Sequence, residues 1–182
     1  MREKLKNFGV VILAAGRGKR LNCDGLPKVL YEIGGRPIVS YVLAELEKSG
    51  VAKSRICLVV GFREELVKEK FGPDYLYASQ AECLGTAHAA LTGAKALPEN
   101  YYNFLVLNGD DSAFYKFSSL AELMEFHLTN NNDITILTCE PDNPQGLGRI
   151  VRAGDGRIKE VVEKENMTPE LEKFKEINTG TF

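Results

Sequence analysis

Short apolar segments alternate with segments of helical periodicity along most of the chain, and this alternation restricts the folds that it can adopt. Residues 9–13 are apolar throughout, which is typical of a parallel strand buried on both faces. Four helices and four further strands are predicted in strict alternation after it: helices at 37–49, 64–71, 86–95 and from 119, and strands at 55–60, 75–78, 104–107 and 133–139. This order predicts an α/β fold, with a Rossmann-like, mostly parallel sheet and helices on both faces. Such sheets bind ligands at the carboxyl ends of their strands.

Two helix starts carry specific signals. Pro37 can stand in the first turn of the helix 37–49 without losing a needed hydrogen bond. Ser119 and Glu122 have the spacing of a capping box, in which each side chain bonds a free backbone N–H at the helix start. The sequence therefore predicts that these residues open the first and fourth helices.

The pattern changes after Cys139. Two strands are predicted at 149–152 and 157–162, joined by a hairpin-type turn. Thr168 followed by Pro169 has the pattern of a helix start. The chain then stops at Phe182, inside a further predicted strand.

Composition and charge exclude several classes of partner. The 182 residues fit one domain, 1–182, with a core of its own. Lys and Arg number 23 against 25 Asp and Glu, a formal net charge of -2, so neither a nucleic acid nor a membrane surface is expected as partner. No sequence feature indicates an oligomeric state.

The cysteines and the apolar runs indicate a cytoplasmic protein. Cys23, Cys57, Cys83 and Cys139 show neither CxxC spacing nor a grouping with histidine, so they are interpreted as reduced thiols. The apolar run 10–15 is too short to cross a bilayer, and the N-terminus does not follow the pattern of a signal peptide.

The strongest local signal is a glycine-containing loop after the first strand, LAAGRGKRL from Leu13 to Leu21. Gly16 and Gly18 allow backbone N–H groups to approach an anion closely. The small Ala14 and Ala15 leave room for a base or a ribose, and the cations of the loop can neutralise phosphate. The pattern favours a phosphate-binding loop, although a tight strand exit with surface cations would show the same residues.

Two better-known phosphate loops are excluded. A Walker A loop requires Ser or Thr where Arg20 follows Lys19, and the dinucleotide fingerprint requires a third glycine where Leu21 stands.

The motif Leu26-Pro27-Lys28 follows shortly after the loop, and together they resemble the signature of the sugar-nucleotide pyrophosphorylase superfamily. The resemblance implies a GT-A-like nucleotidyltransferase fold in which the loop wraps a triphosphate. Attack of one phosphate on another brings like charges together, and positioned cations lower that barrier. The implied roles are catalytic for Arg20 and Lys28 and nucleotide-binding for Leu13, Ala14, Ala15, Gly16 and Gly18.

A second block, residues 80–89, resembles the uridine-reading segment of the N-acetylglucosamine-1-phosphate uridylyltransferases. A glutamine amide can pair with both a donor and an acceptor on the edge of uracil. The resemblance assigns nucleotide binding to Gln80, Gly85 and Thr86. His88 is interpreted as a packing or solvent-edge histidine.

A third block places carboxylates after the strand 104–107. Magnesium favours one or two carboxylates together with phosphate oxygens, and the resemblance makes Asp110 the ligand of a Mg²⁺ cofactor, with Asp111 as the alternative. The family usually has proline where this chain has Ser112, so the path of this loop stays open.

The last quarter of the chain resembles the family's sugar-reading segments. The resemblance implies that the backbone of Gly148 contacts an acetamido group. It also implies that Glu163 and Asn178 bond sugar hydroxyls or that same group. Taken singly, a hairpin Glu is a solvated charge and Asn-Thr-Gly is a turn.

The implied reaction is transfer of UMP from UTP to N-acetylglucosamine-1-phosphate, which gives UDP-N-acetylglucosamine, a cell wall precursor, and pyrophosphate. The sugar phosphate oxygen would attack the α-phosphorus in line, without a covalent enzyme intermediate. The family's second metal ligand and its C-terminal β-helix would lie beyond Phe182, so a shortened chain with an incomplete metal site is expected.

Two other functions stay open. One is a nucleotidyltransferase for another pair, such as CTP and an alcohol phosphate, although Gln80 favours uracil. The other is a non-catalytic nucleotide- or sugar-binding domain.

Overall fold

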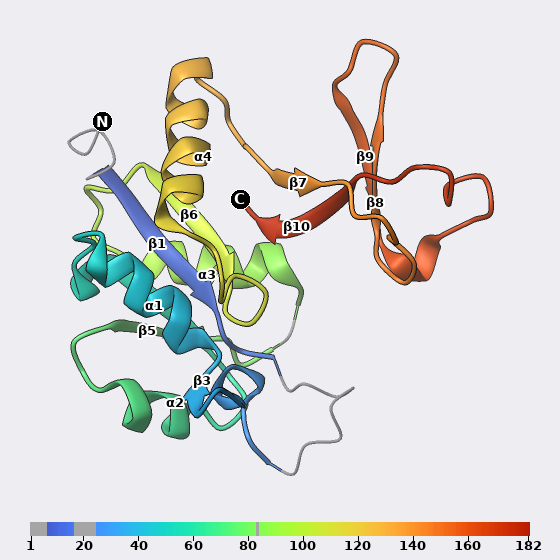
Figure 1. Cartoon of the computed structure of the whole chain (residues 1–182). Coiled ribbons are helices and arrows are strands. Elements are labelled where there is room, and N and C mark those ends of the chain that lie inside the picture. Colours follow the sequence, from blue (N-terminus) through green and yellow to red (C-terminus); the bar gives the residue numbers. More distant parts are fainter. Residues whose placement is uncertain (1–6, 17–24, 83) are drawn as a thin grey trace. The chain divides into compact units, whose positions relative to one another are not determined.

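The computed structural model describes residues 7–16, 25–82 and 84–182, which form two compact units (Figure 1). The first unit runs to Ile134 and includes Phe182, and the second is Thr135–Thr181. No helix in the described ranges combines the length and the apolar character that a membrane span requires.

The first unit is built on a four-stranded parallel sheet in the order β5–β4–β1–β6. The central strand β1 is buried along most of its length, as its unbroken apolar run predicts for a strand covered on both sides. The parallel order confirms the predicted α/β fold. The strands are β1 (Phe8–Leu13), β4 (Ile56–Val60), β5 (Leu76–Ser79) and β6 (Asn103–Asn108).

Helices cover both faces of this sheet, also as predicted. Successive side chains of a strand point to opposite faces, so Val10 and Ile12 pack with one set of helices and Val11 packs with the other. The first face is covered by α1 (Val39–Lys48), α2 (Glu64–Phe71) and α4 (Phe117–Asn130), and the second by α3 (Thr86–Ala96). Short 3₁₀ turns are η3 (Lys28–Leu30), η4 (Lys53–Arg55) and η5 (Lys164–Asn166).

The helix predicted at 37–49 begins at Val39, and the prediction that Pro37 opens it is wrong. Pro37 instead ends a short antiparallel hairpin, β2 (Glu32–Ile33) with β3 (Arg36–Pro37). Its turn residues, Gly34 and Gly35, have φ of 60° and 75°. A Gly-Gly pair between extended segments is typical of a two-residue hairpin turn.

The predicted capping box at Ser119 and Glu122 is also wrong, because α4 begins two residues earlier. The N–H of Phe117 donates to Oε1 of Glu45 on α1, at 3.2 Å. A carboxylate from another helix therefore bonds a donor that the helix start leaves free, and it also complements the helix dipole.

The second unit contains two small antiparallel pairs. β8 (Arg149–Arg152) pairs with β9 (Ile158–Val162), which confirms the predicted hairpin. The strand predicted at 133–139 is reduced to β7 (Leu137–Cys139), and it pairs antiparallel with β10 (Ile177–Thr181).

The helix predicted from Thr168 is absent, and a turn takes its place. The N–H groups of Leu171 and Glu172 both donate to the carbonyl of Thr168, at 2.9 and 3.2 Å. The carbonyl of Phe174, which a continuing helix would use internally, instead accepts from Nε of the buried Arg149 at 2.7 Å.

Candidate functional site

A cavity of about 310 Å³ lies in the first unit at the carboxyl ends of β1 and β6 and at the start of α3. Parallel sheets bind ligands at this edge. We call it the strand-end cavity, and its lining residues are Leu13, Ala15, Gly16, Lys28, Val29, Gln80, Gly85, Thr86, Ala89, Asn108 and Asp110.

Three separate sequence blocks meet at the strand-end cavity. The residues predicted from sequence that line it are Leu13, Ala15, Gly16, Lys28, Gln80, Gly85, Thr86 and Asp110. Ala14 is buried and its N–H donates to the carbonyl of Val59 at 2.8 Å, so this amide is occupied by the sheet. Gly18 and Arg20 lie outside the described residues, and Gly148, Glu163 and Asn178 belong to the second unit.

A cation and a carboxylate meet at one side of the cavity. Nζ of Lys28 forms an ion pair with Oδ2 of Asp110, and these side chains are 42% and 16% exposed. Lys28 is held on η3, whose neighbouring Val29 and Leu30 are buried. Because the turn is anchored by these apolar side chains, its lysine is fixed at the end of β6.

The negative charge at this point is crowded. Loss of hydration around the carboxyl group of Asp111 raises its pKa, and the nearby charge of Asp110 raises it further. Lys28 and a 3.5 Å hydrogen bond from Asn108 act in the opposite direction. The carboxylates of Asp110 and Asp111 therefore favour an additional cation near them.

This arrangement fits a magnesium ion that shares its coordination with a ligand. Among the residues that the structure describes, no group of three or more His, Cys, Asp or Glu could hold a metal alone. Magnesium needs only one or two carboxylates when phosphate oxygens complete its shell. Asp110, with Asp111 beside it, supplies that number.

The opposite side of the cavity is formed by Gln80 and the start of α3. Gln80 is only 6% exposed, and its Nε2 lies 3.0 Å from Nδ1 of His88 and 3.4 Å from the carbonyl oxygen of Gly85. Gly85 precedes α3 with φ of 97°, a conformation that favours glycine. His88 was expected only to pack or to face solvent, and the structure shows it bonded to a cavity residue.

Three lining residues were not predicted from sequence. Ala89 stands three positions after Thr86, so both lie on one face of α3. Asn108 ends β6 and pairs in register with Leu13, a position that the sheet order would have indicated. Val29 reaches the cavity through the path of η3, for which the sequence gives no signal.

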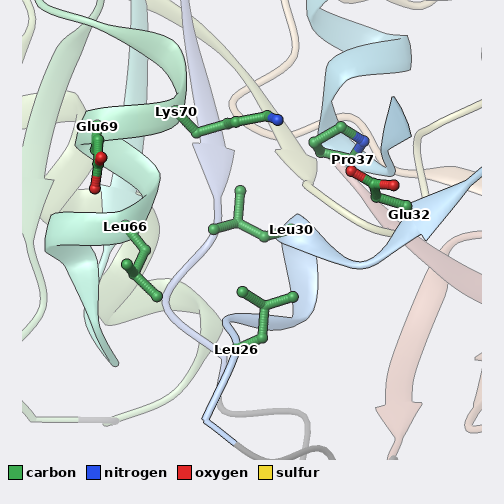
Figure 2. Close-up of a pocket in the computed structure, with 7 residues that line it drawn as sticks. All are labelled: Leu26, Leu30, Glu32, Pro37, Leu66, Glu69 and Lys70. Atoms are coloured by element: carbon green, nitrogen blue, oxygen red, sulfur yellow. The ribbon is translucent and has the colours of Figure 1, made fainter. Parts of the chain in front are cut away.

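A second cavity of the first unit, about 470 Å³, contains none of the predicted site residues (Figure 2). Leu26 and Leu30 face it from the segment that carries Lys28, and Leu66 faces it from α2. The η3 segment thus supplies Lys28 to one cavity and apolar side chains to another. The complete lining is Leu26, Leu30, Glu32, Pro37, Leu66, Glu69 and Lys70.

The three residues of the second unit that were predicted to bind the sugar, Gly148, Glu163 and Asn178, differ in their surroundings. A Cβ on Gly148 would lie 2.5 Å from the carbonyl oxygen of Val162, so the close approach of β8 and β9 requires glycine there. Glu163 is exposed. Asn178 accepts from the N–H of Gly180 at 2.9 Å, a local turn bond within β10.

The fold is α/β, and the strand-end cavity lies at the carboxyl edge of its parallel sheet, the edge at which such folds bind ligands. The chain belongs to the nucleotidyl transferase family, whose sequence profile matches residues 9–182 and therefore spans both units. The resemblance inferred from the sequence motifs is thereby confirmed.

Curated relatives carry the name "Bifunctional protein GlmU". The protein of Acetivibrio thermocellus is 38% identical over 172 residues, which is 94% of this chain and 36% of the relative. That of Pelotomaculum thermopropionicum is 40% identical over 176 residues, 97% of this chain and 38% of the relative. The chain thus spans little more than a third of the length of these relatives.

Solved structures show the same fold. HddC from Yersinia pseudotuberculosis superposes with a TM-score of 0.71 at 24% identity, covering 96% of this chain and 75% of HddC. A UDP-glucose pyrophosphorylase complexed with UDP-glucose superposes with a TM-score of 0.73 at 20% identity, covering 96% and 74%.

Proposed function

We propose that the protein transfers UMP from UTP to N-acetylglucosamine-1-phosphate and releases pyrophosphate. Two findings support this: membership of the nucleotidyl transferase family, and relatives named "Bifunctional protein GlmU" at 38% and 40% identity. A further HddC structure, 26% identical over 96% of this chain with a TM-score of 0.69, is complexed with GMP-PN. A nucleotide is therefore the ligand class that the similarities favour.

The observation that carries the proposal is the Lys28–Asp110 ion pair in the strand-end cavity, opposite Gln80 and the start of α3. A cation and a carboxylate in one cavity suit a polyanion that arrives with a metal ion.

Each side of the cavity is proposed to hold one part of the nucleotide. Gln80, Gly85 and Thr86 would read the base. On the other side, Gly16 and Lys28 would hold the phosphates, and Lys28 would offset the charge that builds up during attack on the α-phosphorus. Asp110, assisted by Asp111, would hold a Mg²⁺ ion, which neutralises phosphate charge when bound. Arg20 is proposed as a second phosphate cation on sequence grounds alone.

The second unit is proposed to recognise the sugar. Glu163 is exposed and free to accept from hydroxyl groups. The Nδ2 group of Asn178 can still donate, because only its Oδ1 is used by Gly180. The backbone of Gly148 would contact the acetamido group of the sugar.

We also propose that the protein acts in the cytoplasm. Among the described cysteines, Cys57 is a buried thiol whose pKa is raised to about 11 by its burial, and Cys139 is an exposed free thiol. Unpaired thiols of this kind persist in a reducing compartment.

Pyrophosphate release tests the proposed function. The protein is supplied with UTP, N-acetylglucosamine-1-phosphate and Mg²⁺, and release should require all three. Lys28→Met should reduce the rate about 10²- to 10³-fold, the range typical of losing one charge-stabilising group. Lys70→Met is the matched control, because Lys70 lines the other cavity and should leave the rate unchanged (Figure 2).

Two outcomes would contradict the proposal. Equal losses in both lysine variants would separate the activity from the strand-end cavity. UTP binding without pyrophosphate release from the unmodified protein would favour a non-catalytic nucleotide-binding domain.

A further inference from the structure

The orientation of the Gln80 amide in the strand-end cavity is fixed by its surroundings. The backbone N–H of Gln80 donates to the carbonyl of Val60 at 2.7 Å, which holds the residue at the end of the sheet. The side chain is buried, and its nitrogen Nε2 lies 3.4 Å from the carbonyl oxygen of Gly85. A carbonyl oxygen only accepts hydrogen bonds, so the amide nitrogen, and not the amide oxygen, must face it.

This orientation determines the role of His88. The same Nε2 lies 3.0 Å from Nδ1 of His88, and an amide NH₂ group can only donate. Nδ1 of His88 must therefore be the acceptor, with the ring proton on Nε2. Both N–H groups of Gln80 are then used inside the protein, by Gly85 and by His88.

The oxygen of the Gln80 amide is left for a ligand. No residue in the described part of the chain donates a hydrogen bond to Oε1 of Gln80, whose side chain lines the strand-end cavity. A base in the cavity consequently meets an acceptor at this point. The pairing of one glutamine with both a donor and an acceptor of uracil, expected from sequence, would require an N–H that is already in use.

We propose that His88 is a positioning residue that holds the Gln80 amide with Oε1 toward the base, and so selects bases that present an N–H donor. This inference rests on the proposed function. Uracil presents N3–H at the pairing edge, whereas cytosine presents an unprotonated N3 that would face Oε1 as a second acceptor. His88 thus contributes to the preference for UTP over CTP without touching either nucleotide.

Two variants of His88 separate positioning from packing. His88 is half-buried near the start of α3, so its replacement leaves the core intact. His88→Leu keeps the bulk and removes the acceptor. His88→Asn can place its Oδ1 close to the position of Nδ1 and should restore the bond. Thr92→Val is a control on the same helix, because its hydroxyl bonds only the backbone carbonyl of His88.

Calorimetric titration with UTP and with CTP, each with Mg²⁺, provides the readout. His88→Leu should lose about tenfold in UTP affinity, as expected for one positioned hydrogen bond, and much less in CTP affinity. His88→Asn should recover most of the UTP preference, and Thr92→Val should keep it. An unchanged ratio in His88→Leu, or equal losses for both nucleotides, would overturn the inference.

A measurement without nucleotide keeps the inference separate from the proposed function. The ¹⁵N NMR spectrum of the ligand-free protein should show Nδ1 of His88 unprotonated and Nε2 protonated, with a scalar or proximity signal to the Gln80 amide. A proton on Nδ1 would overturn the inference. If the unmodified protein bound neither nucleotide, the proposed function would fail while this spectrum still decided the role of His88.

Discussion

The two units of the chain are stabilised differently. The strands of the first unit lie between helices, and β4 is buried at every residue. In the second unit, β9 is exposed at four of its five residues, and the few buried side chains include the charged Arg149. The first unit therefore depends on apolar packing, whereas the second depends more on hydrogen bonds to a small number of polar groups.

The largest difference between the units should appear on truncation of an aliphatic strand residue. Leu58→Ala, at a side chain that is 0% exposed in β4, should lower the free energy of unfolding by about 2–5 kcal/mol. Ile158→Ala, at a side chain that is 40% exposed in β9, should change it by less than about 1 kcal/mol. Urea unfolding measures both, and similar losses would show that the second unit has an apolar core after all.

A glycine-to-alanine pair sharpens the same contrast. In α3, a Cβ on Gly93 would lie 2.4 Å from Cγ1 of Val11, so Gly93→Ala should destabilise by about 1–3 kcal/mol through overpacking. A Cβ on Gly154, in the β8–β9 turn, would meet no atom within 4 Å, so Gly154→Ala should fall within about 0.5 kcal/mol of the parent. Thermal unfolding compares the two. A stabilised Gly93→Ala would mean that the gain in helix propensity outweighs the contact with β1.

Replacing Arg149 removes several of the hydrogen bonds that stabilise the second unit. Arg149→Met would leave the carbonyls of Phe174 and Leu147 without their charged donor, and losing hydrogen bonds to a charged group costs about 1.5–3 kcal/mol. Hydrogen exchange followed by peptide should show faster exchange in 135–181 and no change in β1. Arg152→Met, which removes an exposed ion pair with Glu176, is the control and should have a smaller effect.

Replacing one carboxylate by an amide should give the smallest changes in Tm, and these changes should have opposite signs in the two units. The pKa of Asp111 is raised, mainly by loss of hydration, so its charged form opposes folding. Asp111→Asn should raise Tm by about 1–3 °C at pH 7, and the gain should vanish at low pH, where the parent carboxyl is also neutral.

Glu176 supplies the opposite case. Hydrogen bonds from Arg152 lower the pKa of Glu176. At any pH above the ordinary pKa of a glutamate, the charged carboxylate therefore stabilises the second unit. Glu176→Gln should lower Tm by about 1–3 °C at pH 7, and the difference should shrink as the pH falls through the lowered pKa. Calorimetry measures Tm for both variants between about pH 3 and pH 7, roughly the range that brackets both carboxyl groups. A change of Tm in the same direction for Asp111→Asn and Glu176→Gln would contradict this view.

The sequence predicted best what local patterns determine. The central strand β1 was predicted from its apolar run to within one residue, and the helix at Glu64–Phe71 to the residue. Prediction from sequence failed where a residue distant in the chain determines where a helix or turn begins or ends. The start of α4 depends on Glu45 of another helix, and the end of the turn after Thr168 depends on Arg149.

The same division holds for the candidate site. Motifs predicted that Lys28, Gln80 and Asp110 belong to one site, and the structure brings all three to the strand-end cavity. The bond between Gln80 and His88 could not be predicted, since it follows from the position of Gly85 at the start of α3.

The parallel sheet of the first unit also has a consequence for biosynthesis. On the ribosome, β1 emerges early, but its partner β4 follows about 45 residues later and its partner β6 about 95 residues later. At ordinary translation speeds of about 5–20 residues per second, this apolar strand waits roughly 5–20 s for its second neighbour. During that interval an unpaired, hydrophobic segment is exposed to other nascent chains, so ample chaperones, which cover such segments, should improve the yield of folded protein.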